Sequence, residues 1–165
     1  MLNIVVFSDS HGKRERVATL AERTKPDVVL FLGDGLADLD ALPDGVDLRA
    51  VRGNCDLFTR EDAPEARIVT LGAYRLLLTH GHREGVKYSE EAAVARALAE
   101  DADALLYGHT HRATARTYPA GSTLCGRTLD RPFTVLCPGA LGDPQPTVAT
   151  ITLTPHGLLT NVAKL

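Results

Sequence analysis

The 165-residue sequence has no tryptophan, one methionine and only 5% aromatic residues. A platform of aromatic side chains on which nucleic-acid bases stack is therefore not expected. Neither sign of charge dominates, because 18 Lys and Arg stand against 21 Asp and Glu, for a formal net charge of −3. This balance argues against a basic binding surface, so we expect no stable complex with nucleic acid.

Long hydrophobic runs are also missing. The longest apolar stretches span about five residues, whereas a membrane-spanning helix needs about 20. Residues 1–7 lack the charged region and the small-residue cleavage site of a secretory signal peptide. The cysteines Cys55, Cys125 and Cys137 lie far apart and form no CxxC pair, which argues against a disulfide framework and against a thiolate zinc site. We therefore expect a cytoplasmic protein that does not associate with membranes.

The length and the hydrophobic pattern predict a single α/β domain over residues 1–165. Apolar residues at helical spacing predict helices at residues 13–23 and 89–100, the second capped by Ser89. Short apolar runs that stop at turn-forming residues predict strands at residues 2–7, 28–32, 46–51, 67–71, 74–79, 104–107, 113–118, 133–136, 147–154 and 158–164. We expect the strands of the C-terminal third to build a second, mainly antiparallel sheet.

Side chains able to bind metal directly follow five of the expected strands. They are Asp9 and His11, Asp34, Asn54, His80, and His109 with His111. In open α/β sheets, ligands bind beyond the carboxyl ends of the strands, so we expect these side chains to share one cleft. All donate through oxygen or imidazole nitrogen, which suits manganese, iron, zinc, cobalt or nickel. The set is too large for one tetrahedral ion and predicts two ions that share a carboxylate, as in two-metal hydrolytic sites.

Each of these residues also has a purely structural interpretation. Asp9, Asp34 and Asn54 are residue types that often cap helices or form turns, and a single histidine is often a structural polar group. That interpretation leaves unexplained why the oxygen donors alternate with histidine clusters. The remaining histidine, His156, lies in a Pro-His-Gly turn and is expected at the surface.

Five short motifs carry a resemblance to a known family. They are Asp9-Ser10-His11, Gly33-Asp34, Gly53-Asn54, His80-Gly81-His82 and Gly108-His109-Thr110-His111. In order and spacing these motifs resemble those of the calcineurin-like metallophosphoesterases. The chain length and the Gly-Asn-Cys-Asp string are most similar to the small prokaryotic phosphodiesterases of the YfcE type. The resemblance implies a four-layer α/β/β/α sandwich of two mixed sheets, with a dinuclear metal site at its edge.

The resemblance also implies an activity. It is metal-dependent hydrolysis of small or nucleotide-like phosphodiesters by a hydroxide that bridges two divalent ions, of which manganese is favoured over iron, zinc, nickel and cobalt. The implied ligands fall into one group for each ion and one bridging residue: Asp9, His11 and His111; Asn54, His80 and His109; and Asp34. We expect turnover to depend on Asp34, Asn54 and His80.

Residues next to the motifs are candidates for contact with substrate. Cys55 stands where the protein-phosphatase branch of the family has a histidine that assists the leaving group, and a thiol is the poorer proton donor, which favours diesters. Asp56 either assists there or stabilises the turn. His82 either contacts substrate or is simply exposed.

Three arginines lie beside the motifs as well. Arg52, Arg83 and Arg112 either steer a phosphate by paired hydrogen bonds or remain solvated, and Arg83 joins Cys55 and His82 among the substrate-binding candidates. Two other functions stay open. One is a non-catalytic interaction scaffold of the same fold, as for a retromer subunit that resembles these enzymes, and the other is a phosphomonoesterase. A homo-oligomer also remains open.

Overall fold

The computed structural model describes residues 1–59 and 62–165. Its elements follow one another in this order: β1 (Ile4–Phe7), α1 (Arg14–Thr24), β2 (Val28–Phe31), the 3-10 helix η1 (Leu36–Ala41), β3 (Asp47–Ala50), β4 (Ala66–Leu71), β5 (Tyr74–Thr79), α2 (Glu91–Ala99), β6 (Ala104–Tyr107), β7 (Thr114–Tyr118), β8 (Thr123–Leu124), β9 (Arg127–Thr128), β10 (Phe133–Cys137), β11 (Thr147–Thr154) and β12 (Gly157–Lys164). Among the described residues, no helix has the length and apolar character needed to cross a membrane.

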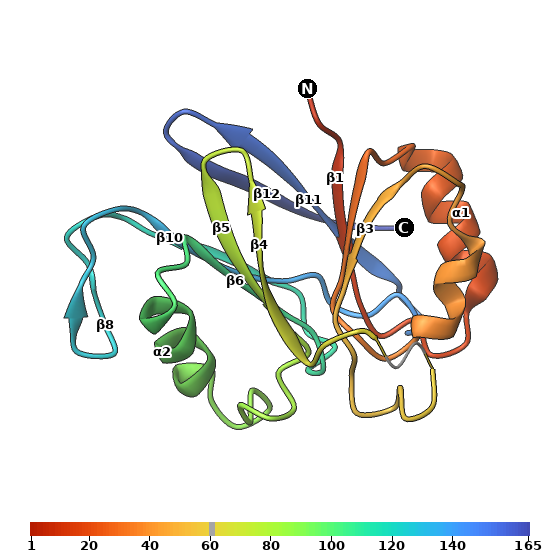
Figure 1. Cartoon of the computed structure of the whole chain (residues 1–165), viewed down its shortest axis with the longest axis horizontal. Helices are drawn as coiled ribbons and strands as arrows, with labels where there is room; N and C mark the ends of the chain where they lie inside the picture. Colours follow the sequence, from red (N-terminus) through yellow and green to blue (C-terminus); the bar gives the residue numbers. More distant parts are fainter. Residues whose placement is uncertain (60–61) are drawn as a thin grey trace.

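Two five-stranded mixed sheets lie between the helices. The first has the strand order β12-β11-β1-β2-β3, and the second has the order β4-β5-β6-β10-β7. In the first sheet β1, β2 and β3 are parallel, and in the second β5, β6 and β10 are parallel. Figure 1 shows α1 outside the first sheet and α2 outside the second, so the layers run helix, sheet, sheet, helix. The expected four-layer sandwich of two mixed sheets is confirmed.

Alternation along the central strands produces this layering, because successive side chains of a strand point to opposite faces. In β1, Ile4 and Val6 join the cluster buried between the sheets, whereas Val5 and Phe7 join the cluster under α1. In β6, Leu106 lies in the cluster between the sheets and Leu105 in the cluster under α2. Strands buried on both faces read as unbroken apolar runs, which is the pattern that the sequence shows.

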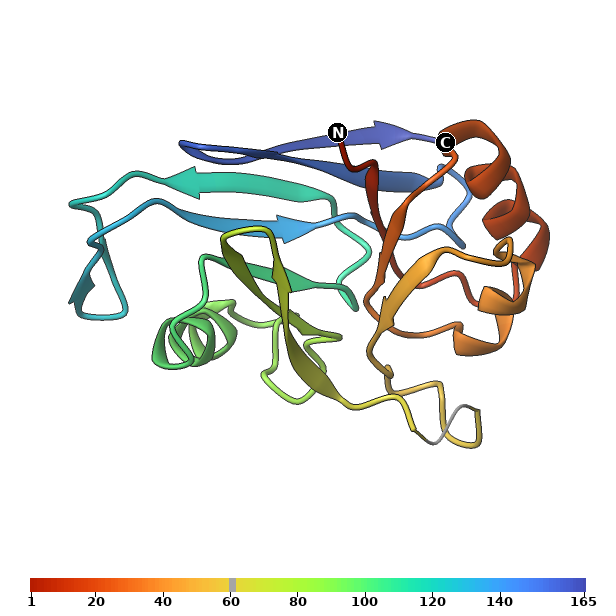
Figure 2. The same cartoon turned by 45° about the horizontal axis from the view of Figure 1, so that its top comes forward.

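The strands of the C-terminal third do not build a sheet of their own, so that expectation is wrong. β7 and β10 complete the second sheet, β11 and β12 extend the first, and β8 pairs only with β9. Figure 2 shows the β8–β9 hairpin projecting at the end of the molecule far from α1. Partners of antiparallel strands are set by long-range packing as well as by local pattern, and β11 pairs with β1 more than 140 residues away in the register Ile4↔Ile151.

Two local expectations also need correction. The 3-10 helix η1 was not foreseen, because its six residues are too few to show helical periodicity. Helix α2 begins at Glu91, so its N-cap is Glu90 and not Ser89. The Ser89 hydroxyl still accepts a hydrogen bond from the Glu91 backbone N–H, at 3.1 Å.

Candidate metal centre

The five motif loops meet at one edge of the molecule. They follow the carboxyl ends of β1, β2 and β3 in one sheet and of β5 and β6 in the other, and within each sheet these strands are parallel neighbours. The loops gather at the lower edge of the sheets in Figure 1, between the two helical layers. The expectation that the strand ends bring these motifs together is therefore confirmed.

The backbone of this edge is bent in an uncommon way. Eight described residues other than glycine have a positive φ, and five of them are proposed ligands: Asp9 (52°), His11 (44°), Asp34 (60°), His109 (66°) and His111 (59°). Residues with a side chain adopt this left-handed conformation rarely, at a cost of about 1–3 kcal/mol each. Such strained backbone persists only where the surrounding structure fixes it. Strained residues are common at sites where side chains are directed at a ligand.

Glycines let the loops approach one another closely. A Cβ at Gly53 would lie 2.0 Å from Asp34 Oδ1, and a Cβ at Gly108 would lie 2.9 Å from Asp9 Oδ2. Both distances are far shorter than carbon–oxygen contact allows, so any side chain at these two positions would displace a proposed ligand. The glycines of the motifs thus have a packing role beside the ligands themselves.

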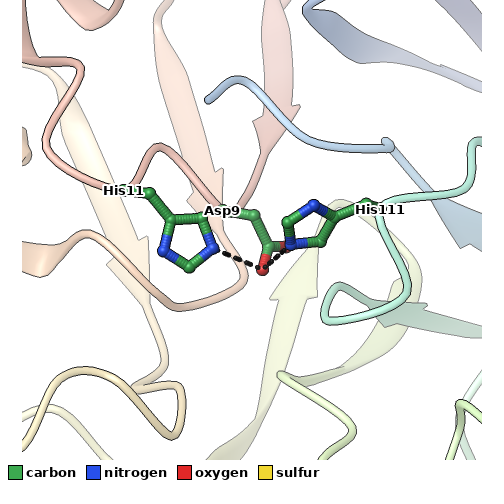
Figure 3. A group of neighbouring side chains, drawn as sticks. All are labelled: Asp9, His11 and His111. Carbon is green, nitrogen blue, oxygen red and sulfur yellow. Dashed lines mark ion pairs between the residues drawn. The ribbon is translucent and has the colours of Figure 1, made fainter. Parts of the chain in front are cut away.

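Asp9 is the centre of the first ligand group. Its Oδ2 accepts hydrogen bonds from the Ser8 hydroxyl (2.6 Å) and from the His109 backbone N–H (3.0 Å). Its Oδ1 is buried and has no hydrogen-bond partner in the described part of the chain. This oxygen faces the Nε2 atoms of His111 at 3.2 Å and His11 at 3.5 Å, as Figure 3 shows. A buried carboxylate oxygen is costly without a partner, and a cation between it and the two imidazoles would supply one.

The tautomer of His111 supports the same conclusion. Its Nδ1 lies 2.9 Å from a carboxylate oxygen of Asp143, which can only accept a hydrogen bond. Nδ1 therefore carries the proton, and in the neutral ring Nε2 presents a lone pair to Asp9. Two acceptors that face each other at 3.2 Å fit a bound cation. Asp143 was missed by the sequence reasoning, because its carboxyl group is 32 residues from His111 and belongs to none of the motifs.

His80 is oriented in the same manner. Its Nδ1 lies 2.7 Å from the Leu32 carbonyl oxygen, so the proton is on Nδ1 and Nε2 points into the site. There Nε2 lies 3.1 Å from Asn54 Oδ1 and 3.3 Å from Asp34 Oδ2. Burial opposes protonation of His80, but its interactions with Asp34 and Asp9 outweigh burial and raise the pKa of the ring. The two carboxylates thus favour a positive charge at this nitrogen.

Asp34 connects the two ligand groups. Its Oδ2 lies 3.8 Å from His11 Nε2 as well as 3.3 Å from His80 Nε2, and its Oδ1 accepts a hydrogen bond from the Cys55 backbone N–H at 2.8 Å. Burial opposes ionisation of Asp34, yet the hydrogen bond and charge of His80 and the Cys55 N–H lower its pKa well below the usual range. Asp34 is thus held as a carboxylate between the imidazoles.

His109 completes the set on the side of the second sheet. Its ring centroid lies 4.9 Å from that of His80. Burial, together with the positive charges of His80 and Lys87, lowers the pKa of His109 to about 4. The ring is therefore neutral near pH 7 and able to act as a metal ligand.

In each of three groups of residues, the ligand atoms lie within 4.8 Å of one another. The groups are Asp9, His11 and His111; His11, Asp34 and Cys55; and Asp34, His80 and His109. Together with the Asn54 oxygen beside His80, all seven proposed ligands are brought to one site. The donors are carboxylate, amide and imidazole groups, which fit borderline divalent ions. The Cys55 thiol at the edge of this set was not foreseen as a metal-competent group.

Asp56 ties two motif loops together. Its carboxylate accepts hydrogen bonds from four backbone N–H groups, those of Asp34 (2.8 Å), Gly35 (2.9 Å), Leu36 (3.0 Å) and Gly53 (2.9 Å). Both oxygens are fully engaged, so of the two roles left open for Asp56, the structure supports stabilisation of the turn.

The three substrate-binding candidates have different surroundings. Cys55 is exposed as a residue, but partial burial of its thiol together with the charge of Asp34 raises the pKa of the thiol. The His82 ring lies 5.4 Å from that of His80, and its buried Nδ1 has no partner among the described residues. Arg83 is exposed and forms an ion pair with Glu65 at 2.8 Å. Contact of these residues with substrate stays a prediction.

Comparison with known proteins agrees with the motifs. Residues 2–155 match the family described as "Calcineurin-like phosphoesterase superfamily domain". The probable metallophosphoesterase YsnB of Bacillus subtilis is 33% identical over 111 residues, which cover 67% of this chain and 64% of YsnB. The chain thus spans less than two thirds of the length of that relative.

Solved structures share the fold over the whole chain. A predicted phosphoesterase from Streptococcus pneumoniae has a TM-score of 0.71 at 24% identity, with coverage of 99% of this chain and 98% of that one. Vps29 from Chaetomium thermophilum also has a TM-score of 0.71, at 18% identity, with coverage of 100% and 97%. Yfce, a phosphoesterase from E. coli, has a TM-score of 0.56 at 22% identity, with coverage of 99% and 98%. At these identities the likeness establishes the fold alone.

Proposed function

The chain belongs to the calcineurin-like phosphoesterase superfamily, and we propose that it is a metal-dependent phosphoesterase that hydrolyses small or nucleotide-like phosphodiesters. One observation carries the proposal. The buried Asp9 Oδ1 has no hydrogen-bond donor among the described residues and lies between the Nε2 atoms of His11 and His111. A fold with no use for a cation would leave this oxygen at a net cost, so the arrangement supports a metal centre.

The proposed centre holds two divalent ions, and manganese is our first candidate among the borderline metals. Asp9, His11 and His111 would hold one ion, Asn54, His80 and His109 the other, with Asp34 between them. When bound, such ions supply a nucleophilic water and polarise the phosphoryl oxygens. The alternation of carboxylate and imidazole donors, with Asp34 and His11 each belonging to two ligand groups, supports two adjacent ions over one.

The chain's own residues have defined tasks in this proposal. Leu32 and Asp143 fix the rings of His80 and His111 with Nε2 directed into the site, so the ligand lone pairs are oriented before metal binds. The lowered pKa of Asp34 keeps its carboxylate ionised, so metal has no proton to displace there. Asn54 Oδ1 and Asp34 Oδ2 both lie within 3.3 Å of His80 Nε2. We therefore propose that turnover depends on Asp34, Asn54 and His80.

Diesters are the proposed substrates because of the residue next to the ligand Asn54. This neighbour is Cys55, whose raised pKa makes the thiol a weak proton donor to a leaving group. Esters with good leaving groups need no such donor. The rim of the site is exposed at both Asn54 and Cys55, which suits a small or nucleotide-like molecule. We propose that the protein works without stable association with nucleic acid or membranes.

Hydrolysis of bis(p-nitrophenyl) phosphate tests the proposal. The protein is stripped with a chelator, reloaded separately with Mn²⁺, Fe²⁺, Zn²⁺, Ni²⁺ or Co²⁺, and compared with the Asp34→Asn variant. We expect metal-dependent release of p-nitrophenolate that the variant lacks. A folded, metal-loaded protein that hydrolyses neither this diester nor p-nitrophenyl phosphate would contradict the proposal. Faster hydrolysis of the monoester would instead assign a phosphomonoesterase.

A non-catalytic scaffold is the second candidate, favoured by the structural likeness to Vps29. That likeness equals the likeness to the Streptococcus phosphoesterase in TM-score, and at 18% identity it concerns the fold alone. Metal binding does not separate the two functions, because a scaffold can retain an occupied site. Turnover does separate them, which is why the diester assay and not a metal-induced thermal shift is the deciding experiment.

A further inference from the structure

A pocket lies beside the candidate metal centre. It has a volume of about 400 Å³ and is lined by side chains that include Val86, Lys87, Glu90, Tyr107, Thr110 and Arg112. We call it the rim pocket. Its size is sufficient for a phosphate group with part of a sugar or a similar linker. None of its lining residues is a proposed metal ligand.

The rim pocket is built from the same two loops that carry the histidines of the second sheet. Thr110 lies between His109 and His111 in the sequence, so one wall continues the β6 motif loop. The opposite wall includes Val86, whose backbone N–H donates to the Gly81 carbonyl oxygen at 3.2 Å in the β5 motif loop. A group in the pocket would therefore lie next to an ester held at the metal centre.

The charge of the rim pocket favours an anion. Lys87 and Arg112 line it, and among the described residues neither forms an ion pair. The single acidic residue named in its lining, Glu90, is already engaged, because it accepts hydrogen bonds from the Tyr107 hydroxyl and from the Arg116 guanidinium. Two cations without partners beside a neutralised carboxylate leave the pocket with an excess of positive charge.

Two arginines near the motifs, Arg52 and Arg83, are committed elsewhere. The Arg52 guanidinium donates to three backbone carbonyl oxygens. Arg83 is paired with Glu65 at 2.8 Å. Of the described basic residues beside the two motif loops of the second sheet, Lys87 and Arg112 form no ion pair, so their charges remain for a ligand. The positive charge of Lys87 also reaches the metal centre, since it acts on His109.

We propose that the rim pocket binds a second anionic group of the substrate, so that the preferred substrate is a phosphoester whose non-leaving part carries a further phosphate or carboxylate. Lys87 and Arg112 are then specificity-determining residues. This inference rests on the proposed phosphoesterase function, because it assumes that the ester itself is held at the metal centre.

Two chromogenic nucleotides that differ by one phosphate test the inference. They are thymidine 5′-(p-nitrophenyl phosphate) and thymidine 3′-phosphate 5′-(p-nitrophenyl phosphate), which share the leaving group. We expect the Mn²⁺-loaded protein to prefer the second, and the double variant Lys87→Ala/Arg112→Ala to lose about tenfold in kcat/KM on it through KM, with little change on the first. The double variant Lys164→Ala/Arg127→Ala, in which two exposed cations outside the pocket lining are removed, is the matched control.

Equal kcat/KM values of the unaltered protein for the two nucleotides, or an unchanged ratio in the Lys87→Ala/Arg112→Ala variant, would overturn the inference. The inference is also wrong if inorganic phosphate, added to the singly phosphorylated nucleotide, reproduces the preference, because the pocket then takes a free anion. If neither nucleotide is hydrolysed, the activity on bis(p-nitrophenyl) phosphate decides on the proposed function, and a binding measurement decides on the pocket. Calorimetry should then show tighter binding of thymidine 3′,5′-bisphosphate than of thymidine 5′-phosphate, lost in the variant, and equal binding overturns the inference.

Discussion

Buried carboxylates at the two ends of strand β6 have opposite surroundings. At its amino end, Asp103 accepts hydrogen bonds from the Arg75 backbone N–H at 2.8 Å and from the Arg131 guanidinium. At its carboxyl end, Asp9 Oδ2 accepts a hydrogen bond from the His109 backbone N–H, whereas no hydrogen-bond donor reaches Asp9 Oδ1 within the described structure. A buried carboxylate with its partners fastens elements together, whereas one left open is available to a cation from outside the chain. The first end stabilises the fold, and we propose that the second binds a metal ion.

Removal of the charge at Asp9 should have the largest effect. In Asp9→Asn the side chain keeps an oxygen for the Ser8 hydroxyl, while the amide N–H can donate to an imidazole lone pair. Because a metal ligand is lost, we expect kcat/KM on bis(p-nitrophenyl) phosphate to fall by about 10³-fold, which corresponds to about 4 kcal/mol. The metal-free variant should melt no lower than the metal-free parent. Activity assays and calorimetry measure these two quantities, and metal analysis checks the loss of bound metal.

A lower melting temperature of the metal-free Asp9→Asn protein would contradict the comparison, because it would mean that Asp9 stabilises the fold without metal. The conservative exchange Asp9→Glu is the control for charge. It restores the carboxylate but lengthens the side chain, and we expect it to recover metal binding only in part.

The same exchange at the other end of β6, Asp103→Asn, should change stability alone. In Asp103→Asn, one carboxylate oxygen becomes an amide N–H that faces the Arg131 guanidinium, so two donors meet. Loss of a largely buried charged partner costs about 2–3 kcal/mol, and we expect the free energy of unfolding in urea to fall by that amount. Metal content and the activity of the folded protein should be unaffected. A decrease in bound metal would show that the two ends of β6 are not independent.

How far the sequence predicted this arrangement depends on the range of the interactions involved. The apolar run of residues 28–32 followed by Gly33-Asp34 marked both a buried strand and the ligand at its end, because both signals are local. The hairpin around Gly72 was read correctly for the same reason. The sheet to which each C-terminal strand belongs could not be read, since it depends on partners far away along the chain.

The candidate site shows the same limit. The identity of the donors and the order of the motifs were visible, but the left-handed backbone at Asp9 and Asp34 was not, because neither residue type requires that conformation. The carboxylate of Asp143 beside His111 belongs to none of the motifs, and the four N–H groups that surround Asp56 come from two motif loops that lie apart in the sequence. Such supporting contacts form only once the loops are folded together.

Asp143 stands between the two cases. Its carboxylate has a hydrogen-bond partner, and that partner, His111, is a proposed ligand of the metal centre. We expect Asp143→Ala to weaken binding of Mn²⁺ by about 10- to 100-fold, since the His111 ring loses the acceptor that fixes its orientation. Asp143→Asn keeps an acceptor oxygen and should recover most of the affinity, a recovery that a general loss of structure would not show. Titration with Mn²⁺ followed by electron paramagnetic resonance measures the affinity. Asp44→Ala, an exposed acidic position outside the site, is the control.

The smallest expected effect concerns the thiol at the edge of the metal centre. Burial and the negative charge of Asp34 raise the pKa of Cys55, and burial raises the pKa of Cys137 to about 11. A thiolate is the reactive form, so in metal-free protein near pH 7 a thiol reagent should modify Cys125 before Cys55, and Cys137 only after unfolding. Asp34→Asn removes the charge that disfavours the Cys55 thiolate and should speed its modification by about threefold. An unchanged rate would mean that a proton on His80 already neutralises the Asp34 carboxylate in the metal-free protein. Until metal binds, the carboxyl end of β6 would then resemble its amino end, where the carboxylate is paired.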